Sequence, residues 1–164
     1  MRLVVADTSP LRYLVKIDLI DILAPLFEKI VIPSVVAEEL LHPSAPAVVR
    51  DWMQHPPAWL EVLASENSGD STFEMLDKGE RAALCLAISL GAGLILVDDR
   101  KGASAGLSKG LEVVGTLGIL DLAAERGLVD FADALGCLRA TNFRYRPGLV
   151  DALLKKWTPD AGPR

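Results

Sequence analysis

Short apolar runs alternate with longer segments in which apolar residues recur every three or four positions. The runs are rich in Leu, Ile and Val, which is typical of strands buried on both faces of a sheet. We expect strands at residues 3–6, 29–32, 60–63, 94–97 and 111–114. The longer segments predict helices, at residues 10–17, 18–23, 34–41, 46–54, 77–90, 116–125, 130–139 and 148–157.

Residues suited to helix ends support these boundaries. Ser9 and Pro10 resemble an N-cap and a first helical position, where the missing N–H of proline costs nothing. Gly91 and Gly127 can adopt the left-handed conformation that commonly ends a helix. Residues 65–73 are polar, and we expect them to form a mobile loop.

Strands separated by helices predict a parallel sheet, because parallel strands need crossover connections. We therefore expect a three-layer α/β/α sandwich with a mostly parallel sheet of four or five strands. Residues 1–157 are expected to form one domain, with a core at about 1–127 and a helical C-terminal extension at 128–157. Residues 158–164 are expected to fray.

The composition is that of an ordinary globular domain. The chain has 164 residues, of which 51% are hydrophobic and 24% charged, and this excludes a disordered chain. No apolar run approaches the roughly 20 residues of a membrane span, and Asp7 interrupts the first run too early for a signal peptide. Cys85 and Cys137 are predicted to be reduced core thiols, which favours a cytoplasmic protein.

The net charge of −5 is unevenly distributed. Residues 139–164 hold six basic and two acidic residues, so the preceding part of the chain is strongly acidic. The basic segment allows phosphate binding, and a solvated helix face is the simpler alternative.

Acidic residues occur directly after the predicted strands or in the helices that follow. They are Asp7, Glu38, Glu39, Glu80, Asp98 and Asp99. In an open parallel sheet these positions meet at the carboxyl edge, where the binding site lies. Crowded carboxylates raise each other's pKa values, and Mg²⁺ or Mn²⁺, which prefer oxygen ligands, remove that penalty.

Each acid also has an ordinary explanation. Asp7 could cap the next helix, and Glu80 could complement the dipole of its own helix. Glu38 and Glu39 could form a solvated face, and Asp98–Asp99 could belong to a loop. We interpret their joint occurrence at one edge as a shared metal site, in which Glu39 is preferred and Glu38 stays open.

Other chemistries lack their motifs. The chain has no Gly-x-x-x-x-Gly-Lys-Ser/Thr loop, and Gly102–Gly106 lacks the spacing of a dinucleotide fingerprint. His42 and His55 stand beside prolines and are predicted to lie on the surface, so Ser9 has no partner for a nucleophilic triad.

Four short motifs between about residues 3 and 120 resemble those of PIN-domain proteins. The motifs are Ala6–Leu11, Ile32–Leu40, Gly79–Leu84 and Leu96–Lys101. Their order and spacing are together fairly specific, and they are most similar to a prokaryotic branch related to VapC toxin ribonucleases.

This resemblance implies a metal-dependent ribonuclease that hydrolyses RNA phosphodiester bonds with Mg²⁺ or Mn²⁺. Its acidic quartet would be Asp7, Glu39, Glu80 and Asp99, with Asp98 as a further metal ligand. Ser9 would support Asp7 by hydrogen bonding, and the RNA backbone would pass Arg100 and Lys101.

A toxin–antitoxin pair is one setting for such an enzyme, and an antitoxin protein would then be its partner. The alternative is a non-catalytic PIN-fold protein that binds RNA or acts in regulation. Three departures from toxin-type relatives are Val97 in place of a usual Thr or Ser, a glutamate at Glu80, and the region beyond about residue 130.

The first helices also predict self-association. They hold more apolar residues than one contact with a sheet can bury, and exposed patches of this kind mark interfaces. We therefore expect a twofold homodimer through Leu11, Tyr13, Leu14, Ile20, Ile22 and Leu23.

Overall fold

The computed structural model describes residues 2–64 and 73–158. The predicted mobile loop at 65–73 and the predicted frayed tail at 158–164 fall almost wholly outside these residues. The chain divides into two compact units, residues 1–116 and 117–164. The single-domain organisation expected from the sequence stays a prediction.

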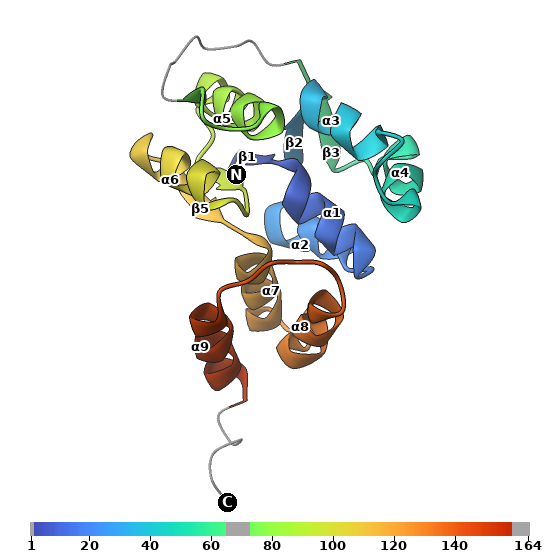
Figure 1. The fold of residues 1–164 in the computed structure, drawn as a ribbon, viewed down its shortest axis with the longest axis vertical. Coiled ribbons are helices and arrows are strands. Elements are labelled where there is room, and N and C mark those ends of the chain that lie inside the picture. The colour runs from blue at the N-terminus through green and yellow to red at the C-terminus, as the bar shows by residue number, and fades with distance from the viewer. Residues whose placement is uncertain (1, 65–72, 159–164) are drawn as a thin grey trace, which may run out of the picture. The chain divides into compact units, whose positions relative to one another are not determined.

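The first unit is built on a five-stranded sheet, drawn from blue to yellow in Figure 1. Its strands are β1 (Val4–Ala6), β2 (Ile30–Pro33), β3 (Leu60–Leu63), β4 (Leu94–Leu96) and β5 (Glu112–Val114). They lie in the order β3-β2-β1-β4-β5, and each neighbouring pair is parallel. The predicted α/β sandwich with a parallel sheet is therefore confirmed.

Helices cover both faces of this sheet. The connections around β2 and β3 contain α1 (Thr8–Lys16), the short η1 (Ile20–Ile22), α2 (Leu23–Phe27), α3 (Ser34–Leu41) and α4 (Ala47–Gln54). The connections around β4 contain α5 (Lys78–Leu90) and α6 (Arg100–Ser108). Because crossovers between parallel strands are right-handed, these two groups lie on opposite faces.

The central strands explain why the sequence shows continuous apolar runs there. All residues of β1 and β4 are at most 1% exposed, so both faces of these strands are buried. Val5, Val31 and Ile95 pack with α5 in one core cluster on one face. The edge strand β3 is less completely buried, and its Val62 is 40% exposed.

The strand order also creates a switch point between β1 and β4. From β1 the chain proceeds to β2 and β3 on one side, and it then returns to β4 and β5 on the other. In such sheets the crevice for ligands lies beyond the carboxyl ends of the two strands at the switch point. Asp7 directly follows β1, and Asp98 lies two residues after β4.

The second unit contains most of α7 (Thr116–Glu125), together with α8 (Phe131–Arg139) and α9 (Pro147–Trp157). The side chain of Asp121 accepts hydrogen bonds from Lys156 Nζ at 2.9 Å and from Trp157 Nε1 at 2.8 Å. Across residues 2–64 and 73–158, the helices are too short or too polar to span a bilayer.

Two predictions about helices are wrong. The first helix begins at Thr8 with Asp7 at its N-cap, so Ser9 is already helical. The helix α6 was not predicted, because Gly102 and Gly106 lower helix propensity. Both glycines are buried in α6, and side chains of the sheet and α5 occupy the space beside them.

The premise for a homodimer is also wrong. Five of the six side chains proposed for the interface are at most 7% exposed, namely Leu11, Leu14, Ile20, Ile22 and Leu23. Tyr13 is half-buried. These five side chains belong to the interior and do not form the exposed apolar patch that was expected, and the homodimer itself stays a prediction. Similarly, Cys85 is buried as predicted, whereas Cys137 is exposed and is not a core thiol.

Truncation of a side chain in the central sheet should cost much of the stability. Ile95 is fully buried between β1 and β5, so Ile95→Ala should lower the free energy of unfolding by about 2–5 kcal/mol. The matched control is Ile88→Ala on α5, where the side chain is 42% exposed and alanine favours the helix. Urea unfolding measures both variants, and equal losses would contradict the described core.

Candidate active site

The candidate acids reach the crevice from different elements. Asp7 is the N-cap of α1, and Glu39 lies in the last turns of α3. Glu80 lies in the first turn of α5, and Asp99 is the N-cap of α6. Three of the four positions therefore follow from where a helix begins at the carboxyl edge, whereas Glu39 reaches it from the end of α3.

Asp7 is the most constrained of these acids. Its side chain is 6% exposed. Burial raises the pKa of Asp7 to about 7, although a hydrogen bond from the Thr8 backbone opposes the shift. The negative charges of Asp77, Glu39 and Asp98 raise this pKa further.

Glu80 lies in the same electrostatic environment. Burial raises its pKa to about 9, and a hydrogen bond with the Asp77 side chain adds to the shift. The neighbouring charges that act on Glu80 are those of Asp77, Asp99 and Asp7. We call Asp7, Glu80 and the acids whose charges act on them the acidic cluster; its members are Asp7, Glu39, Asp77, Glu80, Asp98 and Asp99.

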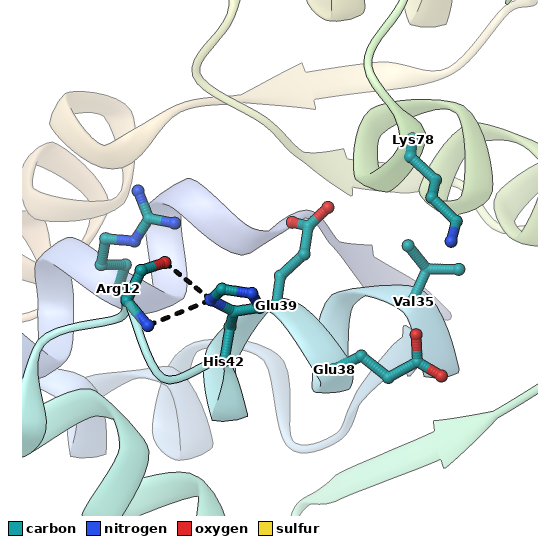
Figure 2. A pocket seen from close by; sticks show the side chains of 7 residues that line it. Arg12, Val35, Glu38, Glu39, His42 and Lys78 are labelled. Carbon is teal, nitrogen blue, oxygen red and sulfur yellow. Dashed lines mark hydrogen bonds between the residues drawn. The ribbon is translucent and has the colours of Figure 1, made fainter.

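The structure distinguishes the two adjacent glutamates of α3. The hydroxyl of Thr8 donates a hydrogen bond to Glu39 Oε2, which holds the Glu39 carboxylate beside Asp7. Glu38 is exposed, and Figure 2 shows the two carboxylates pointing in different directions. Of the pair, Glu39 therefore belongs to the acidic cluster.

Asp98 is held by three hydrogen bonds. Its carboxylate accepts from the backbone N–H of Thr116 at 2.6 Å and from the Thr116 hydroxyl at 2.8 Å. The Ser9 hydroxyl donates to Asp98 Oδ2 at 2.8 Å, so Ser9 supports Asp98 and not Asp7 as predicted. Burial raises the pKa of Asp98, and these three hydrogen bonds oppose the rise.

Asp99 has a structural role as well as a place in the acidic cluster. Its Oδ1 accepts from the backbone N–H of Lys101 at 2.8 Å, which caps α6. Arg100 and Lys101 consequently lie exposed in the first turn of this helix. The ordinary explanation of Asp99 from the sequence is a loop position, and the structure gives it the more specific role of N-cap of α6.

Three glycines make room for the carboxylates. A Cβ at Gly79 would lie 2.6 Å from Glu39 Oε1, and a Cβ at Gly115 would lie 2.9 Å from Asp98 Oδ1. A Cβ at Gly102 would lie 3.2 Å from Glu80 Oε2. A larger residue at Gly79 or Gly115 would displace an acid of the cluster, and one at Gly102 would press on both Val97 and Glu80.

Sequence reasoning missed Asp77. It is the N-cap of α5, and its Oδ1 accepts from the backbone N–H of Glu80 at 2.9 Å. The signal was present, because an N-cap acid three residues before a glutamate resembles a capping box. That spacing brings the Asp77 and Glu80 carboxyl groups together at the helix start.

The donor chemistry of the acidic cluster fits a hard divalent cation. Its members offer carboxylate oxygens alone, and the charges named around Asp7 and Glu80 are all negative. Mg²⁺ and Mn²⁺ prefer such ligands. Within residues 2–64 and 73–158, no three His, Cys, Asp or Glu side chains are placed as a metal ion would need.

Comparison with known protein families yields a match over most of the chain. A sequence profile of the family DUF3368, described as a PIN domain, matches residues 3–159. The match includes the acids of the cluster and continues past residue 120, where the recognised motifs end, through α9. No curated protein and no solved structure matches the chain.

The raised pKa of Asp7 predicts a pH-dependent stability of the protein in EDTA. Between about pH 4 and 7 the folded state keeps a proton that the unfolded chain releases, so the free energy of unfolding should fall as pH rises. For Asp7 this fall is on the order of 4 kcal/mol. Asp7→Asn should exceed the wild type in stability above about pH 7 and approach it near pH 4.

Urea unfolding of the two proteins from about pH 4 to 8 measures this difference. The comparison near pH 4 is the internal control, because residue 7 is then largely uncharged in both folded proteins. A stability difference that does not change with pH would contradict the assigned pKa shift.

Proposed function

The chain belongs to the PIN-domain family, and on this premise we propose that it is a metal-dependent ribonuclease. The observation that carries the proposal is the burial of Asp7 and Glu80 among other carboxylates. A protein gains no stability from this arrangement. Its use is to hold a cation where a phosphodiester can bind.

Asp7, Glu39, Glu80 and Asp99 would hold Mg²⁺ or Mn²⁺, with Asp98 as a further ligand. When bound, the cation supplies a water of lowered pKa and neutralises charge on the phosphodiester. The chain's own contribution is positioning. The Thr8 hydroxyl orients Glu39, and the hydrogen bonds from Thr116 and Ser9 fix Asp98 at the end of β4.

Arg100 and Lys101 are the proposed contacts for the RNA backbone beside the acidic cluster. They follow Asp99 directly and are exposed in the first turn of α6, so they can bind phosphates without entering the cluster. Single-stranded RNA is the proposed substrate, because a narrow carboxylate crevice does not admit a duplex easily.

A role as the toxin of a toxin–antitoxin pair is the finer form of this proposal. The protein would act in the cytoplasm, where its free thiols Cys85 and Cys137 stay reduced, and an antitoxin protein would bind it. Growth arrest on expression that Asp7→Asn abolishes would support this role, and unaffected growth would count against it.

Asp7→Asn should remove both cleavage and the response to metal. Loss of an outer-shell group already costs about 10- to 100-fold in metal affinity or activity, so loss of Asp7 should cost about 100-fold or more in Mn²⁺-dependent cleavage of unstructured RNA. In thermal melts, Mn²⁺ should stabilise the wild type by about 1.4 kcal/mol per tenfold excess over its Kd, and the variant much less.

The control is the same RNA incubated with EDTA, together with the variant purified in parallel. Cleavage that persists in EDTA, or equally in Asp7→Asn, would contradict the proposed mechanism. RNA binding by the wild type without Mn²⁺-dependent cleavage would favour the alternative, a non-catalytic PIN-fold protein.

Gly79→Ala tests the role of Glu39 without changing an acid. The new Cβ would meet the Glu39 carboxylate, which is flexible and can move away from Thr8. We expect cleavage to fall by about 10-fold or more, as for other losses of ligand positioning, while the fold persists.

The matched control is Gly136→Ala in α8, where a Cβ would have no atom within 4 Å. This variant should keep full cleavage and gain up to about 1 kcal/mol of stability. Wild-type cleavage by Gly79→Ala would show that the position of Glu39 does not matter.

A further inference from the structure

A surface pocket adjoins the acidic cluster and shares Glu39 with it. The pocket has a volume of about 380 Å³ and is lined by side chains of α1, of α3 and the residues directly after it, and of α5. Among them are Arg12, Glu38, Glu39, His42 and Lys78. This volume lies within the range of about 300–1,000 Å³ that is typical of small-ligand sites. Figure 2 shows Glu39 between Arg12 and Lys78 in this view.

Arg12 contributes an unused hydrogen-bond donor. Its Nε atom is buried and has no hydrogen-bond partner in the part of the chain that the structure describes. Leaving a buried donor of a charged group unpaired is costly, so an acceptor that reaches Arg12 would relieve this cost. A guanidinium presents several donors in one plane, an arrangement that matches phosphate oxygens.

His42 and Lys78 add donors to the pocket from two other segments of the chain, the end of α3 and the start of α5. The backbone N–H of Ser44 donates to His42 Nδ1 at 3.0 Å. Because Nδ1 accepts this hydrogen bond, Nε2 is the ring nitrogen left to act as a donor. Lys78 is the first residue of α5, and its ammonium group is exposed.

We propose that this pocket binds a backbone phosphate of the RNA strand, next to the phosphodiester held at the acidic cluster. The inference rests on the proposed function, because it takes the strand to pass the cluster. Arg12, His42 and Lys78 offer donors, and phosphate oxygens are acceptors. Because Glu39 borders both sites, a strand that leaves the cluster on this side enters the pocket.

Glu38 allows a test in the opposite direction, in which removal of a charge should raise the affinity for RNA. Its exposed carboxylate lines the same pocket and would repel a phosphate there. Removal of this charge should therefore strengthen RNA binding, whereas removal of Arg12 or Lys78 should weaken it. A pocket that is merely part of a solvated surface would respond to none of the three changes.

The experiment measures binding of a short single-stranded RNA by fluorescence anisotropy in EDTA and, separately, in Ca²⁺. Arg12→Gln and Lys78→Gln should each weaken binding by about 5- to 20-fold and reduce the slope of log K against log salt by nearly one. Glu38→Gln should strengthen binding by about 2- to 5-fold. Thermal melts confirm folding, and Lys78 is exposed, so one cation variant tests the pocket even if Arg12→Gln is unstable.

The matched control is Lys29→Gln, which removes the same charge at the amino ends of the strands, away from the carboxyl edge where the acids lie. Lys29 precedes β2 and pairs with Glu61 at 2.7 Å. It should leave both affinity and salt dependence close to those of the wild type. If Lys29→Gln and Lys78→Gln lowered the affinity for RNA equally, the loss would come from the net charge of the protein and not from the pocket. This result would overturn the proposal.

Unchanged binding by Lys78→Gln and by folded Arg12→Gln would also overturn it, as would a wild type that binds no RNA in either buffer. These outcomes are distinct from failure of the proposed function. Loss of binding in the pocket variants, without Mn²⁺-dependent cleavage by the wild type, would keep the phosphate pocket and contradict the nuclease.

Discussion

Two neighbouring parallel strands can be joined only by a crossover, and the right hand of that crossover determines where the acids of this protein meet. The chain runs from β1 outward to β2 and β3 and then returns to β4 on the other side. The covering helices therefore change face between β1 and β4. Asp7 and Asp98 face the resulting crevice because each follows one of these two strands.

The fold treats the acids at this crevice in two ways. Three hydrogen-bond donors face Asp98 and oppose the rise in its pKa that burial causes. Asp7 and Glu80 instead have other carboxylates as neighbours, and their pKa values rise to about 7 and about 9. Asp98 thus differs from Asp7 and Glu80 in the number of hydrogen-bond donors that offset its burial.

Sequence patterns could predict the sheet and most acids because both leave local signals. Each predicted apolar run became a strand, and Asp7 stood out because it interrupts the first run. The pattern missed α6, since glycine disfavours a helix and only the folded protein shows what fills the space beside Gly102. It also misassigned Ser9, whose partner Asp98 lies 89 positions away and leaves no trace in local spacing.

The site depends on three glycines beside the carboxylates, because the absence of a Cβ at each of them leaves room for an acid. Gly79, Gly102 and Gly115 carry no reactive group, yet the side chains of Glu39, Glu80 and Asp98 occupy the space that a Cβ would need. Grafting only the acids onto another parallel α/β scaffold would therefore fail to reproduce the centre. The transferable unit is each acid together with the glycine that it packs against.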